Sequence, residues 1–235
     1  MHELAVIARI RTPFPEKFGI PRQSGLVPQT TGTIVFEPPY RNPDALRGIE
    51  GFSHLWLIWA FDRAVRQGWS ATVRPPRLGG NARMGVFATR SPFRPNGIGL
   101  SCVTLQDVRL DTPDGPVLIV GGADLADGTP IYDIKPYIPY ADCHPDATQG
   151  FTRQHADYAL KVDFPQALLA RIAQDQRQAL IGVLAQDPRP SYQDDSSRVY
   201  GVAFAGKNVK FTVDGDTLRV VDVEPYRKTD NKKEA

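Results

Sequence analysis

Proline and glycine interrupt nearly every apolar run in this sequence, and no other feature constrains the fold as strongly. The chain has 235 residues, of which 20 are glycine and 21 are proline, residue types that end helices and favour turns. The first half therefore predicts six short strands with few helix-length patterns between them. These strands are Leu4–Ile10, Gly32–Phe36, His54–Phe61, Met84–Thr89, Leu100–Leu110 and Val117–Gly121. We expect a mainly antiparallel sheet or barrel, and neither a helical bundle nor a doubly wound α/β fold.

The strand expected over Leu100–Leu110 shows a clear period of two. Its alternation places residues 102, 104, 106 and 108 on one face and residues 101, 103, 105 and 107 on the other. Such a strand separates a buried face from an exposed face.

The composition changes after a polar stretch near residues 140–157. A strand is predicted over Tyr158–Phe164, and Asp163 is suited to cap a following helix with Pro165 in its first turn. Apolar positions at helical spacing follow, at Leu168, Leu169, Ile172, Leu180, Val183 and Leu184. Further strands are predicted over residues 199–204, 209–213 and 218–223, the last two joined by a hairpin at Asp214-Gly215. The sequence thus predicts a β-barrel domain over residues 1–145 and a small α+β domain over residues 146–235.

Several classes of protein are disfavoured by what the sequence contains. The two cysteines, Cys102 and Cys143, are too few for a disulfide framework, and the four histidines are scattered, so no metal site is expected. His54 lies in an apolar run, which is typical of a buried histidine. The N-terminus does not have the pattern of a signal peptide, and the apolar stretch Phe52–Phe61 is too short to cross a bilayer. We expect a cytoplasmic protein with no membrane partner.

Charge is distributed unevenly, although the net charge is only +2. Residues 71–100 contain five arginines and no acidic residue, while residues 107–146 contain eight aspartates against Arg109 and Lys135. The arginines are Arg74, Arg77, Arg83, Arg90 and Arg94. Because the guanidinium group binds phosphate and carboxylate through paired hydrogen bonds, this segment predicts an anionic partner.

Two turn-rich segments are candidates for ligand binding. Ser91–Ser101 combines two prolines with Asn96-Gly97, so it predicts a rigid loop that presents Arg94. Its GIGLSC stretch lacks the third glycine and the strand–helix context of a dinucleotide fingerprint, so a Rossmann site is rejected. Asp124–Tyr140 gathers Asp124, Asp127, Asp133 and Lys135 around glycine and proline, a pattern that suits a ribose diol or a cation, or simply turns.

Five segments of this chain closely resemble the TrmO family of TsaA-like tRNA methyltransferases. They are IPRQSGLV (20–27), GFSHLWLIW (51–59), VRPPRLGGNARMGVFATRSPFRPNGIGLS (73–101), DLADGTPIYDIKPYIPY (124–140) and AQDPRPSY (185–192). They follow one another in the order of the family, and the long arginine-bearing segment is the most specific.

The resemblance implies a β-barrel enzyme that uses S-adenosylmethionine and works as a homodimer. The expected reaction is methylation of N6 of threonylcarbamoyladenosine at position 37, in the anticodon stem-loop of tRNA. By motif position the resemblance implies a set of cofactor-binding residues: Ser24, Gly25, Leu26, Asp62, Arg63, Arg90, Leu100, Gly121, Gly122, Ala123 and Asp124. The arginine segment suggests Arg74, Arg77, Arg83 and Arg94 as tRNA-binding residues, and Lys135 from the aspartate-rich segment completes this set.

Methyl transfer requires the protein mainly to position the two reactants, since the sulfonium already activates the methyl group. Asp127 is the candidate acceptor for the N6 proton. Two alternatives remain open at this point. One is a non-catalytic RNA-binding barrel that stacks bases on Phe93, Tyr137 and Tyr140. The other is a methyltransferase that acts on a small anionic metabolite.

Overall fold

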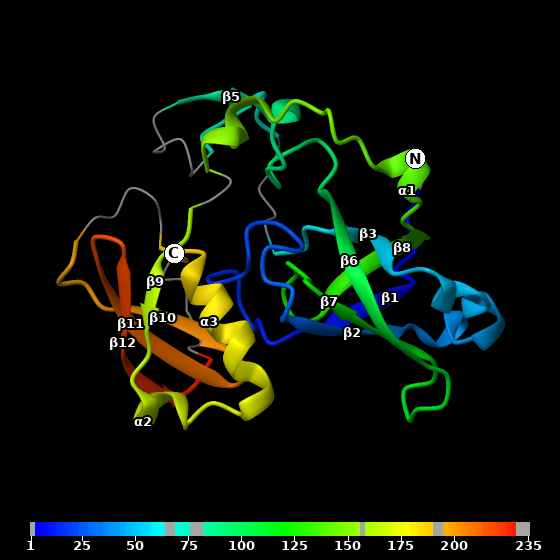
Figure 1. Ribbon diagram of the computed structural model, residues 1–235. Helices are drawn as coiled ribbons and strands as arrows, with labels where there is room; N and C mark the ends of the chain where they lie inside the picture. The colour runs from blue at the N-terminus through cyan, green and yellow to red at the C-terminus, as the bar shows by residue number, and fades with distance from the viewer. Residues whose placement is uncertain (1–2, 64–68, 76–81, 156–157, 190–194, 229–235) are drawn as a thin grey trace, which may run out of the picture.

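Six strands of the first half close into an antiparallel barrel, in the order β1-β2-β7-β6-β3-β8 (Figure 1). The computed structural model describes residues 3–63, 69–75, 82–155, 158–189 and 195–228. The barrel strands are β1 (Ala8–Arg11), β2 (Thr31–Phe36), β3 (His54–Ala60), β6 (Ile98–Arg109), β7 (Val117–Gly121) and β8 (Thr129–Pro136). The expected β-barrel is therefore confirmed.

Apolar side chains from every strand fill the barrel. One residue from each strand, 1% exposed or less, illustrates the layer: Ile10, Ile34, Leu57, Val103, Leu118 and Ile131. Because strand side chains alternate, the neighbours of these residues point outwards, and they form the surface on which loops dock.

Four details of the first half differ from the sequence-based expectation. The strand expected from Leu4 begins only at Ala8, and the strand expected over Met84–Thr89 is limited to β5, followed by a 3-10 turn. β8 was not predicted, because its two prolines and its charged residues Asp133 and Lys135 conceal the alternation. His54 is exposed rather than buried, since the pattern of β3 puts its first residue on the outer face.

β6 shows where the simple alternation stops. Ser101 and Val103 face the core, as one predicted face requires, but a register shift lies between Leu105 and Asp107. Beyond this bulge the sides exchange, so that both Leu105 and Val108 pack against the core.

Short elements connect the barrel strands. The arginine-rich segment forms a two-stranded arm, β4 (Thr72–Val73) with β5 (Met84–Gly85), at the top of Figure 1. The short helices of the first half are η1 (Pro38–Tyr40), η2 (Pro43–Leu46), η3 (Ile49–Gly51), η5 (Val86–Ala88), α1 (Pro139–Asp142) and η6 (Gly150–His155).

The second half forms a four-stranded sheet in the order β10-β11-β12-β9. Its elements are β9 (Lys161–Asp163), α2 (Gln166–Leu169), η7 (Gln174–Gln176), α3 (Arg177–Ala185), β10 (Tyr200–Phe204), β11 (Lys207–Asp214) and β12 (Thr217–Pro225). The predicted hairpin at Asp214-Gly215 joins β11 to β12, with Gly215 at a φ of 55°. The boundary at residues 145/146 remains a prediction.

The helical part of this unit is broken where a longer helix was expected. The residues between Ile172 and Leu180 are almost all polar, so no apolar stripe links α2 to α3. The expected cap at Asp163 is wrong. Pro165 occupies the cap position of α2, and the Asp163 carboxylate instead accepts a hydrogen bond from Arg219 Nε at 2.7 Å.

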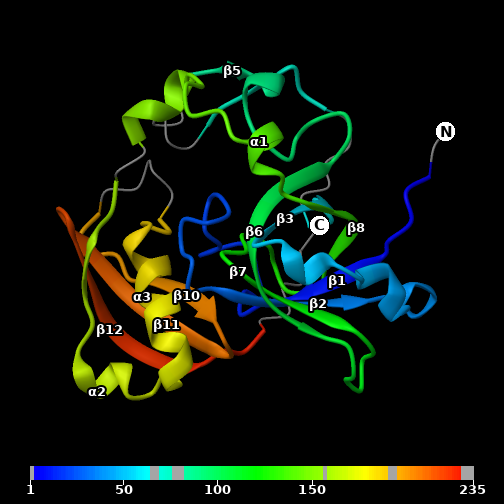
Figure 2. The same cartoon turned by 45° about the vertical axis from the view of Figure 1, so that its right-hand side comes forward.

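The segment after β1 lies between the barrel and α3, as the blue trace in Figures 1 and 2 shows. Phe14 and Val27, both buried, belong to the hydrophobic core of the second unit, and Phe18 and Ile20 pack against it. This segment also carries the predicted cofactor residues Ser24, Gly25 and Leu26, so both halves of the molecule meet at the candidate site.

Candidate functional site

The loop of Ser24 and Gly25 lies against the end of β7. The Gly25 amide donates to the Gly122 carbonyl at 2.9 Å. Gly122 has a φ of 73°, and a Cβ added there would lie 3.2 Å from the backbone nitrogen of Gly25. A glycine is therefore favoured at residue 122 both by its backbone conformation and by the close approach of the loop.

The same loop completes the edge of β6. The β6–β7 ladder ends where Thr104 pairs with Gly121, so β7 offers no partner to the Cys102 amide. The Cys102 amide instead donates to Ser24 Oγ at 3.1 Å. The Ser24 side chain thus replaces a neighbouring strand as a hydrogen-bond partner of β6. The outer side of β6 carries Leu100, which is 53% exposed.

Asp124 lies at the centre of this cluster. Ser101 Oγ donates to Asp124 Oδ1 at 2.6 Å and itself accepts from Trp59 Nε1 at 3.0 Å. Burial raises the pKa of the Asp124 carboxyl group, while the Ser101 hydrogen bond, the Ser24 backbone and the charge of Arg90 oppose that rise. A carboxylate kept in a largely dehydrated place at an energetic cost is typical of a ligand-binding group.

Arg90 joins the cluster from the arginine segment. Its guanidinium group donates to Gln23 Oε1, next to Ser24 in the chain. Leu26, 37% exposed, and Leu100 add apolar surface beside these polar groups. The structure therefore brings together eight of the predicted cofactor residues, namely Ser24, Gly25, Leu26, Arg90, Leu100, Gly121, Gly122 and Asp124. Ala123 is buried in the same turn.

The two remaining predicted cofactor residues, Asp62 and Arg63, form a second group with the candidate proton acceptor Asp127. Arg63 donates to the carbonyls of Pro15, at 2.7 Å, and of Asp127. Asp127 Oδ1 accepts from the Thr12 amide at 3.0 Å, and its side chain is exposed. Asp62 is also exposed. Among the hydrogen bonds of the described residues, none joins this group directly to Asp124.

The predicted tRNA-binding residues have different surroundings. Arg74 and Arg83 are exposed on the arm, where Arg83 donates to Thr72 Oγ1 at 3.1 Å. Arg94 donates to the Thr89 and Ser91 carbonyls at 3.1 and 3.4 Å, so it also holds its own loop. Lys135 is paired with Asp133 at 2.8 Å. Arg77 lies outside the described residues.

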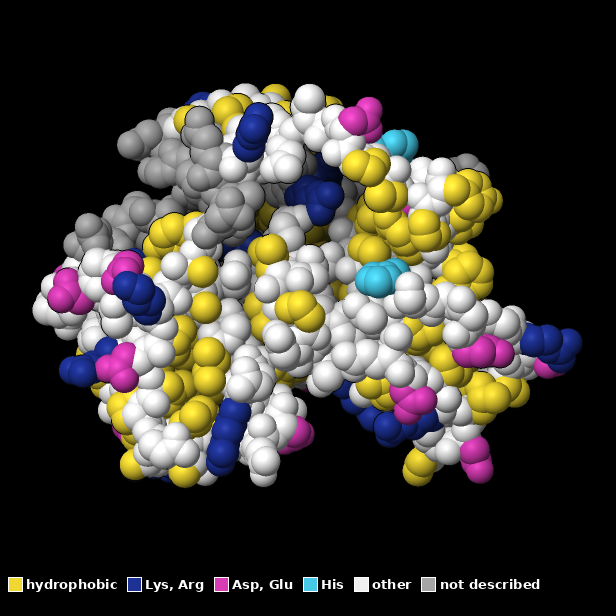
Figure 3. All heavy atoms as spheres, in the orientation of Figure 1, with side chains coloured by type: hydrophobic (Ala, Val, Ile, Leu, Met, Phe, Trp, Pro, Cys, Tyr) yellow, Lys and Arg dark blue, Asp and Glu magenta, His cyan; other side chains and the backbone are white. Residues whose placement is uncertain are grey.

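Sequence reasoning missed two features of this region. Trp69 and Phe87 stack at the arm, with ring centroids 6.3 Å apart and side chains that are 54% and 73% exposed. The hydrogen bond between Ser101 and Trp59, which supports Asp124, was also missed. The predicted alternation had only placed Ser101 and Cys102 on opposite faces of the strand. Figure 3 shows basic side chains in the hollow below the arm.

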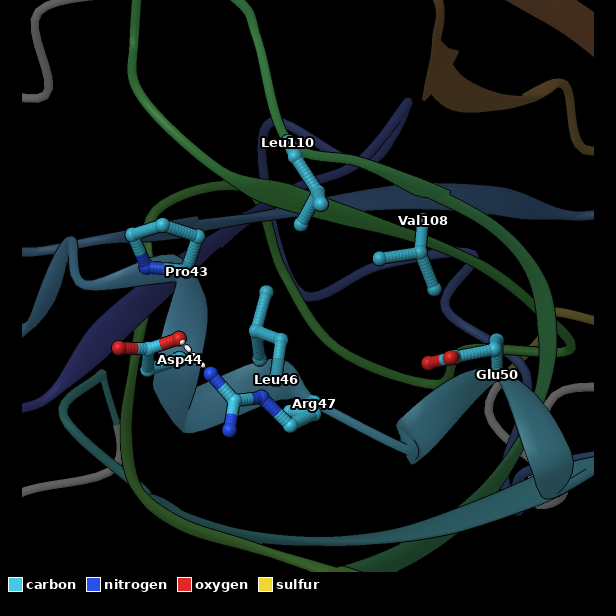
Figure 4. Close-up of a pocket in the computed structure, with 7 residues that line it drawn as sticks. All are labelled: Pro43, Asp44, Leu46, Arg47, Glu50, Val108 and Leu110. Carbon is cyan, nitrogen blue, oxygen red and sulfur yellow. Dashed lines mark hydrogen bonds and ion pairs between the residues drawn. The ribbon is translucent and has the colours of Figure 1, made fainter.

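A pocket of 350 Å³ lies elsewhere, where η2 and η3 meet the far end of β6 (Figure 4). It is lined by Pro43, Asp44, Leu46, Arg47, Glu50, Val108 and Leu110. Asp44 and Arg47 form an ion pair within its wall. None of the predicted site residues lines this pocket, so we place the candidate site at Asp124.

The described parts of the chain offer neither a cluster of metal ligands nor a membrane-spanning helix. No group of three or more His, Cys, Asp or Glu side chains there is arranged to hold a metal ion. No helix there is long and apolar enough to cross a membrane. Cys102 and Cys143 are free thiols, and burial raises the pKa of the Cys102 thiol, with Asp142 contributing.

Comparisons with known proteins show what the chain as a whole is similar to. The chain matches the tRNA-methyltransferase O N-terminal domain over residues 9–143 and the TrmO C-terminal domain over residues 157–226. It is 44% identical over 227 residues to the tRNA (adenine(37)-N6)-methyltransferase of Escherichia coli, covering 93% of this chain and 96% of that protein.

Two matches to Pseudomonas aeruginosa proteins extend the comparison. The chain is 41% identical to a putative S-adenosylmethionine-dependent methyltransferase, RcsF, covering 94% of this chain and 97% of that protein. A crystal structure of TrmO superposes with a TM-score of 0.78 at 36% identity, covering 96% of this chain and 98% of that one.

Proposed function

Because the chain belongs to the tRNA-methyltransferase O family, we propose that it is an S-adenosylmethionine-dependent methyltransferase acting on N6 of adenine 37 in tRNA. The observation that carries this proposal is the cluster around Asp124. There, two loops and the middle of β6 meet through the Gly25–Gly122, Cys102–Ser24 and Ser101–Asp124 hydrogen bonds.

The residues present fit S-adenosylmethionine. The Asp124 carboxylate suits the ribose diol or the ammonium group, and the Arg90 guanidinium suits a carboxylate. Gly122 carries no Cβ where the loop approaches most closely, and Leu26 and Leu100 offer exposed apolar surface for the adenine. When bound, the cofactor supplies an electrophilic methyl group, so the chain has only to bind, orient and remove a proton.

The proton leaves N6 of the adenine as the new N–C bond forms, and we assign its uptake to Asp127. The Asp127 carboxylate is exposed, and Oδ1 is held by the Thr12 amide, which fixes its orientation. Arg63, which donates to the Asp127 carbonyl, holds the backbone of the same residue. General-base contributions of this kind are worth about 10²- to 10⁴-fold in rate.

The arm is the proposed tRNA surface. Residues 71–100 have no acidic residue, and Arg74 and Arg83 are exposed there beside the stacked Trp69–Phe87 pair. Guanidinium groups bind phosphates, and exposed aromatic rings stack on unpaired bases, so this combination suits a single-stranded RNA loop. We take the substrate to be the anticodon stem-loop that carries threonylcarbamoyladenosine at position 37.

The homodimer expected from the family resemblance and the cytoplasmic location expected from the lack of a signal peptide belong to the same proposal. The exposed apolar residue Ile98 lies on the outer side of β6, where a second copy could cover it. The two-domain division at residues 145/146 is likewise part of the proposal.

The test is methyl transfer in a purified system. The protein is incubated with S-adenosylmethionine and tRNA that does or does not carry the threonylcarbamoyl group, and the nucleosides are analysed by mass spectrometry. One added methyl group on the modified adenosine is expected. Cofactor binding without transfer to any tRNA would favour the small-metabolite alternative, and absence of cofactor binding would favour the non-catalytic RNA-binding barrel.

A further inference from the structure

The motif at residues 185–192 has no part in the site described above, yet it contains an unusual buried ion pair. Asp187 and Arg189 are each 8% exposed. The Asp187 carboxylate accepts from Arg189 Nε at 2.9 Å and from a second guanidinium nitrogen at 3.0 Å. Tyr158 Oη donates to the same carboxylate at 2.9 Å.

The backbone of this motif is fixed in a strained conformation. Asp187 has a φ of 49°, a left-handed value that a non-glycine residue adopts at a cost. Burial opposes the charge of Asp187, but the hydrogen bonds from Arg189 and Tyr158 outweigh it and lower the pKa of the carboxyl group. The ion pair is thus a rigid support that holds two carbonyl groups in fixed directions.

Arg22 binds these two carbonyls. One guanidinium nitrogen of Arg22 donates to the Asp187 carbonyl and to the Arg189 carbonyl, each at 3.3 Å. Arg22 precedes Ser24 by only two residues, so the second unit is bonded to the start of the cofactor loop.

Packing fixes the other end of the same loop on the second unit. Val27 is buried in that unit's core, and a Cβ added to Gly182 of α3 would lie 2.7 Å from a Val27 methyl group. Upstream, the Phe14 ring packs edge-on against Phe204, with centroids 5.5 Å apart. Residues 22–27 are therefore held by the second unit on both sides of the stretch that contacts β6 and β7.

We propose that Arg22 is a positioning residue, which transmits the rigid Asp187–Arg189 support to the cofactor loop and so makes the second unit part of the cofactor site. The inference rests on the proposed function only for the identity of the ligand. The barrel holds Ser24 and Gly25 from one side, through Cys102 and Gly122, and Arg22 holds the loop from the other. With either side released, the loop loses the conformation that the ligand needs.

The experiment compares Arg22→Met with Arg171→Met as a matched control. Arg171 lies in the second unit and donates to the Asp222 carboxylate and the Val223 carbonyl. It is far from the loop in the sequence and makes no hydrogen bond to it among the described residues. Amide exchange is measured without cofactor, and S-adenosylmethionine binding is measured by calorimetry. In Arg22→Met the Gly25 amide should exchange at least about tenfold faster, and the dissociation constant should rise about tenfold. In Arg171→Met neither quantity should change.

A second variant separates positioning from direct contact between Arg22 and the ligand. Asp187→Asn keeps the left-handed turn, which asparagine tolerates, and weakens the support without altering Arg22. It should raise the dissociation constant about threefold, and in combination with Arg22→Met it should add almost nothing. Fully additive effects, or a Gly25 amide that exchanges at the wild-type rate in Arg22→Met, would overturn the proposal. A wild-type protein that binds no S-adenosylmethionine would refute the proposed function, while the exchange data would still decide the role of Arg22.

Discussion

At the scale of single residues, the proposed cofactor site depends most on Asp124. Burial raises the pKa of its carboxyl group, so the folded protein holds this proton more tightly than the unfolded chain does. Stability associated with Asp124 is therefore fully present below the ordinary pKa of aspartate and is lost as the pH rises through the raised value. Ionisation of Asp124 thus costs folding stability, and ligand binding explains why this group is present.

The first prediction follows from the upward shift in the pKa of Asp124. Asp124→Asn should increase thermal stability at neutral pH and flatten its pH dependence, because the amide still accepts from Ser101. It should also weaken S-adenosylmethionine binding about tenfold or more, as the loss of a charge-assisted hydrogen bond requires. Melting curves across the acidic range and calorimetry measure the two effects. Asp214→Asn, at an exposed hairpin residue, is the control, and equal behaviour of the two variants would show that Asp124 has no binding role.

Glycine supplies the second prediction. Gly122→Ala and Gly128→Ala both put a side chain at a positive φ, 73° and 78°, so both should lose about 1 kcal/mol of stability. Only the Cβ at residue 122 meets another backbone, that of Gly25, whereas the space at residue 128 is open. S-adenosylmethionine binding should therefore weaken in Gly122→Ala alone. A similar loss in both variants would mean that the contact with Gly25 is irrelevant to the cofactor.

Much of the cofactor cluster could be predicted by matching residues to the family motifs, because motif position identifies residues one at a time. Ser24, Arg90 and Asp124 were found in this way, and the structure brings them together. The supporting residues Ser101, Trp59 and Arg22 could not be found, since their role depends on contacts between distant segments. The side-chain surroundings of Lys135 and Arg94 likewise depend on partners that only the folded chain supplies.

At the scale of elements, short apolar runs interrupted by glycine and proline predicted five of the six barrel strands, and this signal failed where another constraint dominates. The two prolines of β8 lie near its ends, where a strand tolerates them. Pro130 is the second residue of the strand, and Pro136 is the last, where the ladder with β3 also ends. The bulge in β6 reverses the faces of the strand, which no period of two can predict. The expected long helix failed because the polar residues between Ile172 and Leu180 leave it no continuous apolar stripe.

The arm provides the third prediction. Arg83→Ala should weaken tRNA binding and reduce the salt slope by about one unit, as the loss of one phosphate contact does. Phe87→Ala should weaken tRNA binding with little change in slope, since stacking is not ionic. Arg90→Ala should instead raise the cofactor dissociation constant more than that of tRNA. Salt titrations of tRNA binding, with cofactor binding measured in parallel, test each variant. Arg47→Ala, at the residue that follows η2, is the control. Unchanged slopes in Arg83→Ala would exclude the arm as the RNA surface.

At the scale of the whole molecule, the barrel and the second unit share the segment after β1, which carries cofactor residues while it packs into the second core. The change in composition near residues 140–157 marks where the second unit begins in the sequence. Composition could not show that residues 14–27 pack into the core of that second unit. A division of the chain by sequence alone therefore separates residues that fold together.

The fourth prediction concerns assembly. Sedimentation at micromolar concentration should give a species of twice the 26.0 kDa chain mass. Ile98→Glu, which places a charge on the exposed side of β6, should shift that species towards the single chain. Asp111→Glu, which alters an already charged exposed residue, should not. A wild-type protein that sediments only as a single chain would contradict the homodimer.

The central claim is methyl transfer to adenine 37 at the Asp124 site, and one measurement tests it most directly. Wild-type protein and Asp124→Ala are given labelled S-adenosylmethionine and tRNA that carries threonylcarbamoyladenosine, and the labelled nucleoside is identified. The account predicts one labelled methyl group on N6 of that nucleoside with the wild type, and a strong loss with Asp124→Ala at a cofactor concentration that saturates only the wild type. Label on a different nucleoside, or equal transfer by both proteins, would contradict it.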